Sequence, residues 1–75
     1  MFGKFQVHMV FEGTNGRKRT EMSVFQHNTV EEAENAAIKS MLYHNGGKRS
    51  GACKGYIITR DFPDYIQHVK QKIYC

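Results

Sequence analysis

The sequence predicts an α+β fold in which a three-stranded sheet of ββαβ connectivity packs against one helix, followed by a C-terminal helix. Three observations support this prediction: an Asn-Gly pair between two alternating apolar segments, a helix-capping signal ahead of apolar residues at helical spacing, and a β-branched segment ahead of the single proline. With 75 residues the chain is expected to form one domain. We place the ββαβ core in residues 1–62 and a C-terminal helix or strand in residues 63–75.

The first two strands are predicted over residues 4–12 and 18–26, on either side of Asn15-Gly16. Apolar and polar residues alternate along the first segment, which is typical of a half-buried strand. Asn-Gly favours a two-residue type I′ turn, because both central residues of that turn require positive φ. The two segments are therefore expected to form a β-hairpin.

A two-residue loop also predicts the register of this hairpin. It sets the cross-strand pairs Met9–Met22, Val7–Val24 and Glu12–Arg19. In this register Met22 and Val24 lie on the apolar face, and an acidic residue faces a basic one. Turn, apolar pattern and charge therefore agree on one hairpin.

The helix is predicted to begin after Thr29, because Thr29 and Glu32 fit a capping box. Apolar residues then recur at helical spacing, at Val30, Ala33, Ala37, Ile38, Met41 and Leu42. The helix is expected to stop at residues 45–47, Asn-Gly-Gly, since glycine tolerates the left-handed conformation after a helix.

The third strand is predicted over residues 55–60, which are rich in β-branched and aromatic residues, and Phe62-Pro63 ends it. We expect this strand beside the first, in the order 2-1-3, with a right-handed crossover. The tail is expected to be helical on the spacing of its apolar residues, at Phe62, Ile66, Val69 and Ile73. A strand over residues 67–74 is the alternative for this tail.

The basic residues form clusters that this topology brings to one end of the molecule. The expected contact residues follow the Asn-Gly turn or lie in and beside the glycine-rich stretch 46–51; they are Arg17, Lys18, Arg19, Lys48, Arg49 and Lys54. A C-terminal helix would add Lys70 and Lys72 as secondary contacts. The acidic start of the helix, Glu31, Glu32 and Glu34, lies at the opposite end.

This charge distribution predicts the kind of partner. The net charge of +4 and the pI near 9.3 favour polyanions or acidic surfaces. We therefore expect a basic binding module that engages nucleic acid or a nucleoprotein complex, with Tyr43, Tyr56 or Phe25 as stacking residues if they are exposed. The alternative is a protein–protein inhibitor that binds an acidic surface of a host enzyme without touching nucleic acid.

The sequence offers no enzymatic or cofactor motif. The four histidines and two cysteines lack metal-ligand spacing, so we expect no metal. The glycine-rich stretch lacks the spacing of a phosphate loop and precedes a strand rather than a helix. Cys53 with His44 would be a nucleophile and base without a third, orienting residue. The protein is therefore expected to be non-enzymatic and free of cofactors.

Hydropathy and cysteine content predict the cellular compartment. No apolar run approaches the roughly 20 residues that cross a bilayer, so no membrane partner is expected. Secreted small domains usually carry more cysteines, which favours the reducing cytoplasm. A disulfide between Cys53 and Cys75 is left open.

The pattern F-x-V, hairpin, T-x-E-E-A-E-x-A-A and Y-I-I-T-R, from Phe5 to Arg60, resembles small phage-encoded ββαβ proteins that inhibit host systems, of the RNA-polymerase inhibitor or anti-CRISPR type. The segment that matches best is the helix start, Thr29–Glu34. The resemblance implies a compact domain that binds a host nucleic-acid machine in the host cytoplasm. The basic charge departs from the acidic inhibitors that mimic DNA, which argues against mimicry. Ribosomal proteins of archaea and eukaryotes share comparable layouts, which keeps direct RNA binding open.

Overall fold

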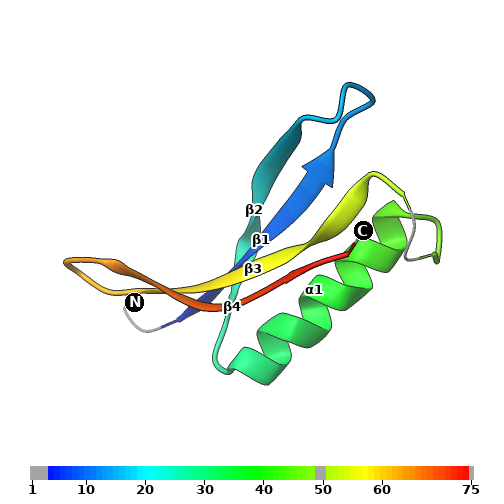
Figure 1. Cartoon of the computed structure of the whole chain (residues 1–75). Coiled ribbons are helices and arrows are strands. Elements are labelled where there is room, and N and C mark those ends of the chain that lie inside the picture. Colours follow the sequence, from blue (N-terminus) through cyan, green and yellow to red (C-terminus); the bar gives the residue numbers. More distant parts are fainter. Residues whose placement is uncertain (1–3, 49–50, 75) are drawn as a thin grey trace.

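The computed structural model describes residues 4–48 and 51–74. One helix packs on one face of a four-stranded antiparallel sheet whose strand order is β2-β1-β3-β4 (Figure 1). The elements are β1 (Phe5–Glu12), β2 (Lys18–His27), α1 (Val30–His44), β3 (Cys53–Asp61) and β4 (Ile66–Ile73). The structure confirms the α+β class and the hairpin followed by a helix. It also confirms that β3 lies beside β1. The predictions of three strands and of a C-terminal helix are wrong.

The tail forms strand β4 and not a helix, and a bulge interrupts the alternation of its side chains. Ile58 pairs with Lys70 and Thr59 pairs with His68, so Val69 is an extra residue on β4. An extra residue shifts the period-two pattern of side chains by one. Ile66 lines the sheet face opposite α1 beside His8 and His68, whereas Val69 packs against the core. The helical spacing of these apolar residues therefore does not mark one buried face, and the alternative prediction of a strand over 67–74 is correct to within a residue.

The hairpin loop is one residue longer than predicted. The Gly13 amide donates to the Arg17 carbonyl at 2.8 Å, which encloses a three-residue loop, and the Gly16 amide donates back to the Gly13 carbonyl at 3.0 Å. Gly16 has φ of 78°, whereas no non-glycine residue of the described chain has positive φ. Asn15 therefore does not adopt the type I′ conformation, and the loop is of the three-residue kind that ends in a left-handed glycine.

This extra loop residue shifts the register of β2 by one position. Met9 faces Glu21, and Met22 faces His8. Because side chains alternate between faces, a shift of one residue exchanges the two faces of a strand. The predicted pairs Met9–Met22, Val7–Val24 and Glu12–Arg19 are therefore wrong, and Met22 and Val24 are 63% and 89% exposed.

A second irregularity displaces the later part of β2 from β1. Gln6 pairs with Gln26 whereas His8 pairs with Met22, so the stretch 23–25 bulges opposite one residue of β1. The buried side chain of Gln6 holds this bulge by donating its amide to the carbonyls of Ser23 and Phe25. The bulge leaves Phe25 70% exposed.

The core lies between α1 and the central strands β1 and β3. Its buried residues are Val7, Met9, Phe11, Ala33, Ala37, Met41, Cys53, Tyr56 and Ile58. The buried positions of α1 are the predicted apolar stripe, because residues four apart share one face of a helix. Burying one large apolar side chain stabilises the fold by about 1.5–3 kcal/mol, so this small cluster supplies most of the driving force for folding.

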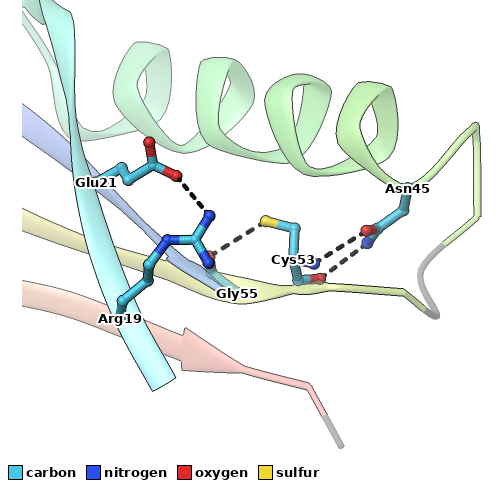
Figure 2. A network of polar contacts seen from close by, with 5 residues as sticks. All are labelled: Arg19, Glu21, Asn45, Cys53 and Gly55. Carbon is cyan, nitrogen blue, oxygen red and sulfur yellow. Dashed lines mark hydrogen bonds and ion pairs between the residues drawn. The ribbon is translucent and has the colours of Figure 1, made fainter. Parts of the chain in front are cut away.

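The start of α1 is capped by a side chain, whereas its end is capped by the Asn45 backbone amide, which donates to the carbonyls of Met41 and Tyr43. The Thr29 hydroxyl accepts the Glu32 amide at 3.1 Å, and the Glu32 carboxylate accepts the Asn28 amide at 3.2 Å. At the other end the Asn45 side chain donates to the Cys53 carbonyl at 2.8 Å and accepts the Cys53 amide at 3.1 Å (Figure 2). The predicted helix start and stop are confirmed, and the end of α1 is anchored to the beginning of β3.

Candidate nucleic-acid interface

Three segments that are distant in sequence meet at one end of the molecule. The tip of the β1–β2 hairpin, the end of α1 and the beginning of β3 lie toward the same side in Figure 1. The Glu12 amide donates to the Ala52 carbonyl at 2.8 Å, which ties the hairpin to β3. The Tyr74 amide donates to the Lys54 carbonyl, which brings the end of β4 to the same place. We call this region the cationic end; it is defined by Arg17, Lys18, Arg19, Lys48, Lys54 and Lys72.

Most of the predicted contact residues are accessible at the cationic end. Arg17, Lys18 and Lys48 are exposed, and Lys54 is half-buried. The open hollow between the hairpin and β3 is lined by Glu12, Gly13, Thr14, Gly51, Ala52 and Lys54. Arg49 lies outside the described residues. The elements that carry the described cations thus lie toward one end of the molecule, although the hairpin register differs from the predicted one.

Arg19 is held in place by two neighbours. Its guanidinium lies 3.3 Å from the Glu21 carboxylate and 5.0 Å from the centre of the Phe11 ring (Figure 2). The side chains of Arg19 and Glu21 are 64% and 58% exposed, so solvent screens this pair and its contribution to stability is at most about 1 kcal/mol. The guanidinium is therefore positioned at the surface and keeps donors for a ligand.

The two secondary candidates, Lys70 and Lys72, differ from each other. The Lys70 ammonium lies 2.7 Å from the Glu34 carboxylate, which also accepts the Tyr56 hydroxyl at 2.8 Å. The ion pair with Lys70 and the Tyr56 hydrogen bond lower the pKa of Glu34. Lys70 therefore has an intramolecular role, whereas the exposed Lys72 lies toward the cationic end with its ammonium 5.6 Å from the centre of the Tyr74 ring.

The carboxylates near the start of α1 and in the β3–β4 turn lie at the other end of the molecule. They are Glu31, Glu32, Asp61 and Asp64. The guanidinium of Arg60, also at that end, lies 5.1 Å from the ring centres of both Phe5 and Phe62. Carboxylates therefore gather at the end opposite to the cationic end, with Arg60 among them.

The proposed stacking residues are placed very differently. Tyr56 is 1% exposed and belongs to the core, so it cannot stack on a base, and that possibility is excluded. Phe25 is exposed on the β2 bulge, away from the hairpin tip. Tyr43 is 83% exposed in the last turn of α1, with its ring 5.6 Å from that of His44. Tyr43 is thus the one of the three that is both exposed and at the cationic end.

A groove of about 210 Å³ lies between β2 and α1, beside Arg19. Its lining combines apolar side chains with carboxylate, hydroxyl and imidazole groups, from Met9, Phe11, Glu21, Met22, Ser23, Ser40 and His44. The His44 ring meets the edge of the Phe11 ring at 5.3 Å. Sequence reasoning missed this groove because it depends on the hairpin register, which turns Glu21 toward the helix side of the sheet.

Cys53 and His8 are the remaining reactive side chains whose surroundings the structure describes in detail. Cys53 begins β3 and is fully buried, and burial raises the pKa of its thiol above the usual value. Its thiol therefore stays protonated and out of reach of a substrate, unlike the loop nucleophile considered from the sequence. The His8 ring and the Thr59 hydroxyl lie 2.9 Å apart on the sheet face opposite α1. Among the described residues, histidine, cysteine and carboxylate side chains form no group of three that could hold a metal.

Comparison of the chain with protein-family models, curated proteins and solved structures gives no match. The part of the chain that the structure describes contains no helix with the length and apolar character needed to cross a bilayer.

Proposed function

We propose that this protein is a non-enzymatic module that binds nucleic acid, alone or within a nucleic-acid-handling complex, through its cationic end. The observation that supports the proposal best is that the hairpin, the end of α1 and the strands β3 and β4 each carry an exposed or half-buried cation toward the same end. Lysine and arginine side chains from several segments can follow the spaced phosphates of a backbone, which a single charged loop cannot do.

The expected binding is electrostatic and depends strongly on salt. Each phosphate that a cation neutralises releases bound counterions, with a log–log slope of about −0.9 per phosphate for duplex DNA. Contacts from about four of the cations would give a slope near −3.6. The exposed ring of Tyr43 beside these cations would add stacking with an unpaired base.

Fluorescence anisotropy tests the proposal directly. Labelled duplex DNA, single-stranded DNA and structured RNA are titrated with the protein at two salt concentrations. We expect tight binding at low salt, a steep loss at higher salt, and strong weakening when Arg17, Lys18, Arg19, Lys48 and Arg49 are neutralised together. Undiminished binding by that variant would overturn the cationic-end model, provided that its circular dichroism spectrum matches the wild type.

A second function is favoured by the apolar residues on the β2 bulge. Val24 and Phe25 are 89% and 70% exposed, and Gln6 holds the backbone that displays them. Large apolar side chains fixed at a surface are typical anchors of protein–protein interfaces. The alternative function is inhibition of a host enzyme, in which the basic charge of the chain favours an acidic protein surface and the β2 bulge adds an apolar contact. In both cases the resemblance to small phage-encoded inhibitors leads us to propose a modulator of a host system.

Competition separates the two functions. A complex with a protein partner should survive an excess of bulk DNA or RNA, and should weaken on Phe25→Ala. A complex with nucleic acid should be displaced by the competitor and should be indifferent to Phe25→Ala, because Phe25 lies outside the cationic end.

A further inference from the structure

We propose that the groove between β2 and α1 takes one unstacked guanine base of a strand whose phosphates lie along the cationic end. This inference rests on the proposed function and adds a base-reading site to it. The groove, of about 210 Å³, is smaller than the roughly 300–1,000 Å³ of pockets for drug-sized ligands, and its size suits one nucleobase.

The hairpin register leaves the groove open. The three-residue loop places Glu21 opposite Met9, on the face that α1 covers in the neighbouring strands. Figure 2 shows the Glu21 side chain directed from β2 toward α1. A polar residue at this position does not pack against the helix, and the space between β2 and α1 stays open. The groove is therefore a consequence of the loop length.

The polar groups around the groove match the edge of a guanine. A carboxylate is an acceptor with two oxygens, and the Watson–Crick edge of guanine presents two adjacent N–H donors. The Ser23 hydroxyl accepts the Phe25 amide at 3.2 Å and keeps its own proton to donate. Ser40 supplies a second hydroxyl from the facing side of α1, and these donors can serve the guanine carbonyl oxygen.

The apolar and charged groups account for the rest of a nucleotide. Met9 and the Phe11–His44 ring pair line the groove and offer surfaces for a base. Arg19 lies next to Glu21 and above the Phe11 ring, so it is the residue of the cationic end that adjoins the groove. A phosphate on that side of the base meets a guanidinium, and no separate anion site is needed.

Thymine or uracil fits the groove less well. Each presents one N–H on its Watson–Crick edge, between two carbonyl oxygens, and a carboxylate facing those oxygens is left partly unpaired. Ser23 and Ser40 are half-buried, and a site with such hydroxyls discriminates against a base that leaves them or the neighbouring Glu21 carboxylate unsatisfied. The groove should therefore prefer guanine over these bases by roughly tenfold.

The test uses labelled single strands of about 12 nucleotides, in DNA and RNA form, made of thymine or uracil with or without one central guanine. We expect the guanine-containing strand to bind about tenfold more tightly to the wild type. Glu21→Gln should abolish this preference while retaining binding of the strand without guanine. Ser40→Leu, which fills the groove from α1, should have the same effect.

Glu12→Gln is the matched control, because it removes a carboxylate at the same end of the molecule from a position outside the groove. It should keep the preference for guanine. Equal binding of both strands by the wild type, or a preference that survives both Glu21→Gln and Ser40→Leu, would overturn the groove as a base site and leave the cationic end intact. Failure of the wild type to bind any strand, duplex or structured RNA would instead overturn the proposed function itself.

Discussion

Strands β3 and β2 both flank β1, yet α1 covers them unequally. On β3 the residues opposite Val7 and Met9 are Ile58 and Tyr56, which are 0% and 1% exposed. On β2 the residue opposite Met9 is the exposed Glu21. The register of β3 turns apolar side chains toward the helix, whereas the register of β2 turns a polar side chain toward it. One side of β1 therefore supplies stability, and the other side leaves an open groove.

The largest expected effect is a loss of stability on truncating a buried core residue. Met41→Ala should lower the free energy of unfolding by about 3 kcal/mol, because Met41 is fully buried under β1 and β3 and its truncation leaves a cavity. Met22→Ala is the matched change on β2 and should stay within about 0.5 kcal/mol, since Met22 is 63% exposed. Urea denaturation measures both. Equal losses would mean that Met22 belongs to the core, as the two-residue turn predicts.

The next effect concerns the close approach of β3 and β4. A Cβ at Gly55 would overlap the backbone carbonyl of Lys72, so one of the strands must shift. We expect Gly55→Ala to cost about 2 kcal/mol and to loosen β4 from the sheet. A Cβ at Gly13, in the hairpin loop, would come close to the Asn15 side-chain oxygen, which can move away. Gly13→Ala should therefore cost less stability than Gly55→Ala. Amide hydrogen exchange along β4 distinguishes a local opening from a global loss.

A smaller effect is expected at the β2 bulge. Gln6→Leu removes the amide that pairs with the carbonyls of Ser23 and Phe25. Because these carbonyls lie on an exposed edge strand and can turn to water, we expect a loss of about 1 kcal/mol in the thermal unfolding free energy. The same substitution at Gln26, which is exposed, should have little effect. No difference between the two variants would contradict the role given to Gln6.

The smallest effect is a pH dependence from the Lys70–Glu34 pair. The Lys70 ion pair, with the Tyr56 hydrogen bond, lowers the pKa of Glu34 below its usual value of 4.5. The unfolded chain therefore binds more protons than the folded chain as the pH falls, and this contribution to stability is present above about pH 4.5 and lost below it. Glu34→Gln and Lys70→Ala should each flatten the acid side of a stability–pH curve. An unchanged acid side in both variants would contradict the pairing.

The order of the elements could be predicted from the sequence because local signals determine it. The Thr29 cap, the glycines after α1 and the β-branched run of β3 each act over a few residues. The cationic end followed from that order alone, since it needs only the connectivity and not the register. The elements that carry its described residues lie toward one end of the molecule, Lys72 reaches that end on a strand and not on the predicted helix, and Arg49 lies outside the described chain.

The register and the bulges could not be predicted, because they depend on tertiary packing. Asn15-Gly16 fits both a two-residue and a three-residue loop, and the choice decides which face of β2 meets the helix. Val69 is an extra residue in β4, and it packs against the core whereas Ile66 lines the opposite face, so the helical spacing of these residues does not mark a shared face. Glu21 and Ser40 were therefore not predicted as site residues, since no local signal in the sequence places them in one groove.

The central claim is that the position of the positive charge, and not its amount, determines binding. Two variants with equal net charge test this claim: Arg17→Gln with Lys18→Gln at the cationic end, and Lys4→Gln with Lys39→Gln elsewhere. Anisotropy with duplex DNA over a series of salt concentrations gives the log–log slope for each. We predict that the first variant lowers the magnitude of the slope by about 2 and weakens binding, whereas the second stays near the wild type. Equal weakening by both variants would contradict the account.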